Sequence, residues 1–236
     1  MLTKKQIQRF QKLQQKKYRL SEGLFVAEGE KNVQALVQAN YSVEALYSSL
    51  SQAEWGCETI SEGQMKQLTF LKNPSPYFGV FKIPVADQLK HKGLVVALDG
   101  ISDPGNLGTI IRLCDWFGVP QIWCSLDTVD CYNPKVVQAT MGSLGRVSCL
   151  YTDLAQTLEQ TSLPVYGTFL EGKALGSLDL ASEAVVVMGS ESHGISDAVS
   201  PYVDQQMNIP KYEMSNPIDS LNVGTAAAIV LAAFRS

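Results

Sequence analysis

The chain has 236 residues, of which 45% are hydrophobic and 18% charged, and its net charge at pH 7 is −4. This length can form one large domain or two smaller ones with separate apolar cores, and the negative charge argues against indiscriminate nucleic-acid binding. The longest nearly apolar run, residues 224–234, is too short to cross a bilayer, and the Lys-rich start lacks the apolar core of a signal peptide. We therefore expect a cytoplasmic globular protein without a membrane partner.

The cysteines indicate neither disulfides nor a metal site. There are five of them, an odd number, and no two form a C-x-x-C pair. We expect buried free thiols and no bound metal ion. The cysteines are Cys57, Cys114, Cys124, Cys131 and Cys149.

The first 19 residues contain seven basic side chains and no acidic one. Such a segment suits contact with the phosphate groups of RNA. The alternative is the solvated face of an amphipathic helix, because Ile7, Phe10 and Leu13 have the spacing of a buried stripe. We predict that the basic side chains bind RNA: Lys4, Lys5, Arg9, Lys12, Lys16, Lys17 and Arg19.

The next part of the chain has the pattern of a small α/β domain. Strand-like runs occupy residues 23–29, 43–47 and 79–83, and residues 30–39 have apolar side chains at helical spacing. A polar stretch with Pro and Gly follows at residues 84–93. We therefore expect a first domain at residues 1–85.

From residue 94 onward, short β-rich runs alternate with helical segments. The strand-like runs are LVVAL, QIWCS, RVSCL, PVYGTF, AVVVM and QMNI, and helices are expected at residues 107–117, 135–141 and 154–160 and at the carboxyl end. This alternation predicts a mostly parallel sheet covered by helices on both faces. The second domain is expected to span residues 94–236.

Three segments of this second part pass from an apolar strand through a polar or Gly-containing loop toward a helix: residues 98–118, 185–196 and 207–225. Ligands of α/β sheets bind at the carboxyl ends of the strands, so three such loops can form one pocket. Together the segments resemble the SpoU (TrmH-like) branch of the SPOUT methyltransferases. The motifs are Asn106-x-Gly108-x-x-x-Arg112, Gly189-x-Glu191-x-x-Gly194, and Ile209-Pro210 followed by Ser220-Leu221-Asn222-Val223.

The resemblance implies a fold, a reaction and an assembly. It implies that S-adenosyl-L-methionine donates a methyl group to a ribose 2′-hydroxyl of rRNA or tRNA, in a homodimer. It also implies a SPOUT α/β-knot catalytic domain with a C-terminal trefoil knot. General topology rules disfavour knots, so this expectation has no other basis. The run KKYRLSEGLFVAEGEK is similar to the ribosomal-protein-like RNA-binding domain that often precedes the catalytic domain.

The resemblance also assigns site residues. The implied catalytic residues are Asn106, Arg112, Glu191, Ser220 and Asn222, and the implied cofactor-binding residues are Met188, Gly189, Ile209, Pro210 and Leu221. A guanidinium has a pKa above about 12 and is a poor base, so Arg112 is better suited to hold a phosphate or to stabilise negative charge on the hydroxyl oxygen. Proton acceptance by Arg112 in a desolvated site stays open.

Local alternatives exist for several of these residues. Arg112 can pair with an acid such as Asp115, and Ser220 or Asp219 can serve as the N-cap of the last helix. The loop Lys211–Asp219 departs from many relatives because it is longer and lacks glycine. The alternative function is that of a non-catalytic RNA-binding relative with the same fold. An NAD enzyme is disfavoured because no G-x-G-x-x-G precedes a ribose-binding acid.

Overall fold

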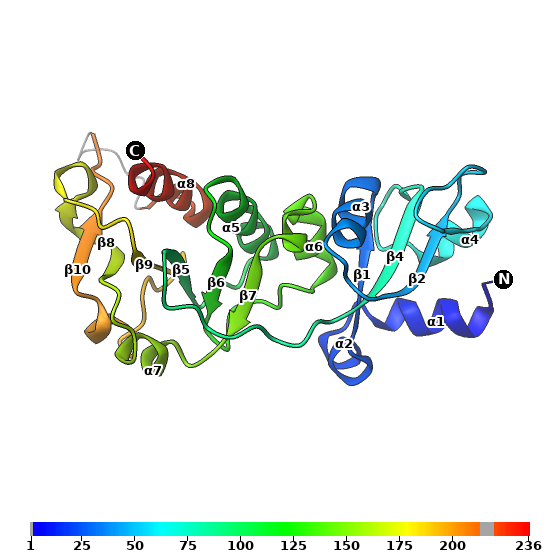
Figure 1. Cartoon of the computed structure of the whole chain (residues 1–236), viewed down its shortest axis with the longest axis horizontal. Helices are drawn as coiled ribbons and strands as arrows, with labels where there is room; N and C mark the ends of the chain where they lie inside the picture. Colours follow the sequence, from blue (N-terminus) through cyan, green and yellow to red (C-terminus); the bar gives the residue numbers. More distant parts are fainter. Residues whose placement is uncertain (1, 213–219) are drawn as a thin grey trace. The chain divides into compact units, whose positions relative to one another are not determined.

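The structure is a computed structural model that describes residues 2–212 and 220–236. The chain forms two compact units (Figure 1). Unit 1 contains Met1–Ala86 and Asp130–Arg146, and unit 2 contains Asp87–Val129 and Val147–Ser236. The sequence assigned residues 130–146 to the second domain because they lie between two of its strands. In the structure they belong to unit 1, because helix α6 (Pro134–Thr140) and the 3-10 turn η1 (Ser143–Gly145) pack there against helix α3 (Glu30–Gln38) and strand β1 (Leu24–Glu28).

The basic start of the chain forms two short helices. Helix α1 (Lys4–Lys12) begins at Thr3, whose side chain accepts a hydrogen bond from the Gln6 backbone in a capping box. Helix α2 (Lys16–Glu22) ends at Gly23, which has φ +63° and so adopts the left-handed conformation that glycine tolerates best.

A four-stranded sheet in the order β1-β4-β2-β3 forms the centre of unit 1. Its strands are β1 (Leu24–Glu28), β2 (Val43–Ser48), β3 (Glu58–Thr59) and β4 (Tyr77–Lys82), and the remaining helices are α3 (Glu30–Gln38) and α4 (Glu62–Leu68). The predicted strands and the helix near residue 30 are confirmed. The sequence did not predict β3 and α4, which are short and largely exposed.

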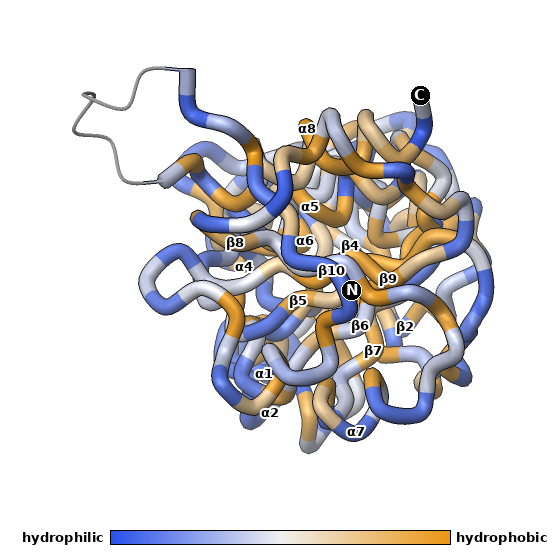
Figure 2. The backbone as a smooth tube through the Cα atoms, turned by 90° about the vertical axis from the view of Figure 1, so that its left-hand side faces the viewer, coloured by the Kyte–Doolittle hydropathy of each residue, from blue (hydrophilic) through white to orange (hydrophobic). Residues whose placement is uncertain are grey.

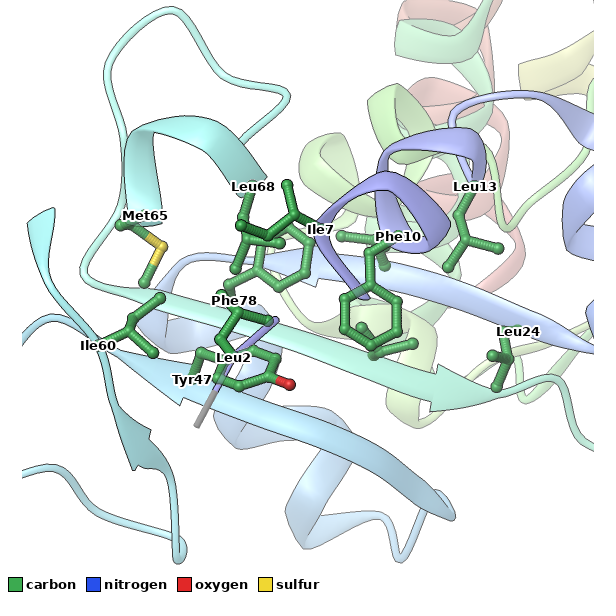
Figure 3. Close-up of a cluster of buried hydrophobic side chains, with 12 residues drawn as sticks. Leu2, Ile7, Phe10, Leu13, Leu24, Tyr47, Ile60, Met65, Leu68 and Phe78 are labelled. Atoms are coloured by element: carbon green, nitrogen blue, oxygen red, sulfur yellow. The ribbon is translucent and has the colours of Figure 1, made fainter. Parts of the chain in front are cut away.

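The predicted amphipathic stripe of α1 forms part of a closed apolar core (Figure 3). Ile7, Phe10 and Leu13 are at most 7% exposed and pack with side chains of the sheet and of α4. The labelled partners in Figure 3 are Leu2, Leu24, Tyr47, Ile60, Met65, Leu68 and Phe78. The basic side chains of α1 therefore occupy the opposite, outer face of this helix.

Unit 2 contains a six-stranded sheet in the order β10-β8-β9-β5-β6-β7. Every neighbouring pair in it is parallel, as predicted. The strands are β5 (Leu94–Asp99), β6 (Gln121–Cys124), β7 (Ser148–Tyr151), β8 (Val165–Ala174), β9 (Ala184–Gly189) and β10 (Gln205–Asn208). The apolar runs of β5 and β9 are fully buried, and their hydrophobic colouring is visible in Figure 2.

Helices cover both faces of this sheet (Figure 1). Helices α5 (Pro104–Trp116) and α8 (Val223–Phe234) pack together on one face, and α7 (Leu154–Glu159) lies on the other. Leu154 and Leu158 of α7 share a core with Val95 and Val185 of the sheet. Short 3-10 turns, η2 (Leu175–Ser177) and η3 (Ser200–Tyr202), complete the unit. The trefoil knot stays a prediction.

No helix among the described residues is long and apolar enough to cross a membrane.

Candidate active site

The loops after β5 and β9 meet at the carboxyl edge of the parallel sheet. Asp99 and Gly189, the last residues of these strands, are paired in register. The Asp99 carboxylate is 7% exposed and accepts a hydrogen bond from the backbone nitrogen of Ser196 at 2.7 Å. This contact fixes the loop after β9 against the end of β5.

Gly189 allows this loop to fold back on the strand. A Cβ atom at this position would lie 2.0 Å from the carbonyl carbon of Gly194. Next to it, Ser190 and Gly194 exchange backbone hydrogen bonds of 3.0 and 2.9 Å. The resemblance to the SpoU branch places Gly189 among the cofactor-binding residues. The structure shows a different need for glycine, since the chain itself occupies the space of a side chain.

Asn222 connects the three motifs. Its Nδ2 atom donates to Oδ1 of Asn106 at 2.8 Å and to Oε1 of Glu191 at 2.7 Å. Its Oδ1 atom accepts from the backbone nitrogens of Gly224 and Thr225, so Asn222 is the N-cap of α8. The sequence left Ser220 or Asp219 open as alternatives for this cap. Ser220 does not cap α8, and Asp219 lies outside the described residues.

Close packing of α5 against α8 explains how Asn106 and Asn222 meet. Asp103 caps α5 by accepting from the Asn106 backbone at 2.8 Å, which places Asn106 in the first turn of a helix that begins three residues earlier than expected. A Cβ at Gly224 would lie 3.0 Å from Cγ2 of Thr109. The small residue at the start of α8 therefore lets the two helix starts approach.

Arg112 extends from α5 into solvent. Its side chain is exposed and forms no hydrogen bond or ion pair with any residue that the structure describes. The alternative that Arg112 pairs with an acid such as Asp115 is therefore not supported by the described residues. Ser220 is likewise exposed, just before α8.

The implied cofactor residues are distributed along the same sheet edge. Met188 is 1% exposed, so its side chain belongs to the core, and a role in cofactor binding would fall to its backbone. Ile209 is half-buried and Pro210 exposed just after β10, and Leu221 is 46% exposed. Residues 213–219 of the unusual Lys211–Asp219 loop lie outside the described residues.

Polar residues after β5 and β6 also shape this edge, although the sequence analysis did not identify them. Ser125 Oγ accepts from the Gly100 nitrogen at 2.9 Å and contacts Asp127 Oδ1 at 2.5 Å. Thr128 Oγ1 accepts from the Ile101 nitrogen at 3.2 Å. The sequence signal that could have identified them is the presence of polar residues directly after two apolar strands. The described residues contain no group of three or more His, Cys, Asp or Glu arranged to bind a metal ion.

In unit 1, the structure corrects the prediction that Arg19 binds RNA. Arg19 is 1% exposed, and its guanidinium is paired with Asp130 at 2.6 Å, so it cannot face RNA. Arg9 has a side chain that is 41% exposed and is paired with Glu44 and Glu22, whose hydrogen bonds raise the pKa of its guanidinium, so RNA contact by Arg9 stays a prediction. The five lysines are exposed: Lys4, Lys5, Lys12, Lys16 and Lys17.

Comparisons with known proteins agree with this architecture. Residues 93–232 match the SpoU rRNA Methylase family, and residues 4–79 match the MRM3-like substrate binding domain. A 23S rRNA guanosine-2′-O-methyltransferase of Bacillus subtilis is 28% identical over 233 residues, which cover 94% of this chain and 92% of the relative.

Solved structures extend the similarity to the whole chain. A TrmH-family protein from Porphyromonas gingivalis is 35% identical with a TM-score of 0.89, covering 100% of this chain and 98% of the other. An AdoMet-bound rRNA methyltransferase from Sinorhizobium meliloti is 28% identical with a TM-score of 0.84, covering 100% and 95%. With a family model that spans all three motifs and most of unit 2, the chain belongs to the SpoU rRNA Methylase family.

Proposed function

We propose that this protein transfers the methyl group of S-adenosyl-L-methionine to a ribose 2′-hydroxyl of ribosomal RNA. The observation that carries the proposal is the contact of Asn222 with both Asn106 and Glu191, which joins the three family motifs at one edge of the sheet. The family match and the 23S rRNA activity in the name of the Bacillus subtilis relative support it.

The residues at this edge suit the proposed cofactor. When bound, S-adenosyl-L-methionine supplies an electrophilic methyl group on a positively charged sulfur. Ile209 and Leu221 would offer apolar surface to it, and the backbone at Gly189 and Pro210 would offer polar groups. Gly189 ends β9, and Ile209 and Pro210 directly follow β10, so these three lie at the carboxyl ends of parallel strands, the usual place for ligands of such sheets.

Arg112 is proposed to act on the RNA. When bound, the cofactor would supply its methyl group to the 2′-hydroxyl oxygen and leave as S-adenosylhomocysteine with the carbon–sulfur electron pair, and the hydroxyl proton would pass to water. The exposed guanidinium has its donors available for the target phosphate and for the negative charge that develops on this oxygen. Ser220 and the free amide hydrogens of Asn106 would orient the ribose, while Glu191 holds Asn222 in place.

The exposed lysines of α1 and α2 are proposed to bind RNA phosphates. Lys4, Lys5, Lys12, Lys16 and Lys17 lie on the outer face of unit 1, which includes the match to a substrate-binding domain. Their charges are not neutralised by an ion pair with any described residue. Phosphate contacts of this kind give affinity without sequence preference.

A homodimer is proposed from the outer surface of α5 and α8. Trp116 is 84% exposed and Ile229 is 39% exposed, although both belong to helices that are otherwise well packed. Exposed large apolar side chains on adjacent helices are typical of subunit interfaces, and two-fold dimers are the commonest assembly. Arg112 lies one turn before Trp116, so this surface reaches the proposed active site.

Comparison of 2′-O-methylation in ribosomal RNA from cells with and without the protein tests the function. We expect one ribose to lose its methyl group, and purified protein with S-adenosyl-L-methionine to restore it on the unmethylated RNA. The 23S guanosine modified by the Bacillus subtilis relative is the first position to examine. An unchanged methylation map, together with no cofactor binding in calorimetry, would favour a non-catalytic RNA-binding protein.

A further inference from the structure

Unit 1 contains a cavity of about 280 Å³ that the proposed methyl transfer does not use. It lies between β1, the residues after α4, and α6. Its walls include Glu28, Phe70, Leu71, Pro134, Lys135 and Gln138. The volume is near the lower end of small-ligand pockets, which suits a single planar group better than a longer ligand.

A buried carboxylate forms one wall. Glu28 is 4% exposed and accepts hydrogen bonds from the Phe70 nitrogen at 2.8 Å and from the Thr69 hydroxyl. It forms no ion pair with any described residue. A carboxylate has about four acceptor positions, so these two bonds leave further acceptor capacity on both oxygens. A ligand with two adjacent N–H donors can use it.

Amide groups lie near the carboxylate. Asn32 is 3% exposed, and its Nδ2 atom donates to Oε1 of Gln138 at 3.4 Å. Oδ1 of Asn32 is buried and has no hydrogen-bond partner among the described residues. The Gln138 nitrogen remains available as a donor at the cavity wall. The polar groups of this region are thus only partly satisfied by the chain itself.

The other walls and the rim suit part of an RNA strand. Half-buried Phe70, Leu71 and Pro134 give apolar surface for stacking of a flat ring. Lys135 is exposed at the cavity and can attract a phosphate. Half of the lining residues come from the region matched as a substrate-binding domain, and α6 contributes the other half.

We infer that this cavity binds an unpaired guanine of the RNA substrate, with its N1–H and N2–H groups donating to Glu28 and its O6 accepting from Gln138. Guanine fits because its Watson–Crick edge carries two adjacent donors next to an acceptor. Adenine and cytosine place a ring acceptor beside their amino group, which would face the carboxylate, and uracil has one donor between two acceptors. The inference rests on the proposed function only in taking RNA as the ligand.

Calorimetry on the full chain with the heptamers UUUGUUU, UUUAUUU and UUUUUUU tests the inference. Saturating S-adenosylhomocysteine keeps the bases out of the proposed cofactor site. We expect UUUGUUU to bind about tenfold more tightly than the other two, as for one well-formed bidentate contact. Glu28→Gln and Gln138→Leu should lose this preference, and Lys135→Ala should weaken all three heptamers alike.

The control is Gln52→Leu, which changes an exposed residue away from the cavity and should keep the preference. Circular dichroism verifies that each variant is folded. Equal affinities for the three heptamers, or a guanine preference that survives both cavity substitutions, would overturn the inference. Methyl transfer to ribosomal RNA is measured in parallel: if it occurs without a guanine preference, only the cavity assignment fails, whereas a preference without any methyl transfer refutes only the proposed reaction.

Discussion

Arg19 and Asp130 are 111 positions apart in the sequence and form an ion pair inside unit 1, with 2.6 Å between Nη2 and Oδ2. Their side chains are 2% and 13% exposed. The Nη1 atom of Arg19 also donates to the carbonyl oxygens of Leu13 and Gln14, each at 2.9 Å. This arginine therefore holds the turn between α1 and α2 and attaches the segment Asp130–Arg146 to the amino-terminal unit.

We predict that Asp130→Ala lowers the free energy of unfolding by about 3–5 kcal/mol, because it leaves a buried guanidinium without its counter-ion. Urea denaturation provides the measurement. The double variant Arg19→Met/Asp130→Ala should recover part of the loss, since it removes the unpaired charge. A change below about 1 kcal/mol in Asp130→Ala, as for an exposed pair, would contradict the structural role of this contact.

Arg112→Ala should reduce methyl transfer by about 100-fold or more, the usual cost of removing a donor that stabilises developing negative charge. Cofactor binding and thermal stability should stay close to wild type, because the side chain is exposed and has no partner among the described residues. Arg112→Lys should restore little activity, since Lys lacks the planar fork. Near-normal turnover of Arg112→Ala on its RNA would refute the assignment.

Charge reversal on α1 and α2 should weaken RNA binding. For the variant Lys4→Glu/Lys16→Glu, we expect lower affinity at low salt and a salt dependence that is less steep by about one unit per lost phosphate contact. The matched control Lys66→Glu/Lys82→Glu changes exposed lysines elsewhere in unit 1. Fluorescence anisotropy with a ribosomal RNA fragment measures the RNA affinity of both double variants. Equal effects of the two variants would assign the amino-terminal lysines to an ordinary solvated face.

Trp116→Glu should convert the proposed dimer into a monomer and lower methyl transfer. The side chain is 84% exposed, so the substitution should leave the fold of the single chain intact. Size-exclusion chromatography with light scattering measures the mass. Leu170→Glu, which changes another exposed apolar residue at 75% exposure, is the control and should stay dimeric. A wild-type protein that is monomeric and active at assay concentration would end the dimer proposal.

The stability of the Glu28→Gln variant relative to wild type should increase as pH rises. Burial raises the pKa of the Glu28 carboxyl above its ordinary 4.5, although hydrogen bonds from Thr69 and Phe70 oppose this shift. The folded state therefore holds the proton more tightly than the unfolded state. The contribution of the protonated Glu28 carboxyl to the stability of the wild type is complete below pH 4.5 and is lost as pH rises through the raised pKa. The difference in melting temperature between variant and wild type should increase from pH 4 to pH 7, and a constant difference would contradict the shift.

Much of unit 2 could be predicted from local patterns. Strands β5 and β9 are buried on both faces, so their sequences are continuous apolar runs that stand out from the polar loops around them. The helix predicted at residues 107–117 is confirmed as α5, but it begins three residues earlier, at Pro104, because Asp103 caps it. Helix α4 was missed because it buries only Met65 and Leu68 and has little periodic signal.

Local sequence patterns were enough to predict the positions of most strands and helices, the basic segment at the amino terminus and the family motifs. Each of these features depends on residues that are close together in the sequence, so a local pattern is enough to reveal it. The partners of individual side chains depend on packing between distant segments. Arg19 carries the same charge as the exposed lysines of the same basic segment, so the sequence does not distinguish it from them. The folded chain brings Asp130 next to Arg19 and buries the ion pair. Likewise, Asn222 reaches Asn106 and Glu191 because α5 and α8 approach closely at Gly224, a contact that no local pattern contains.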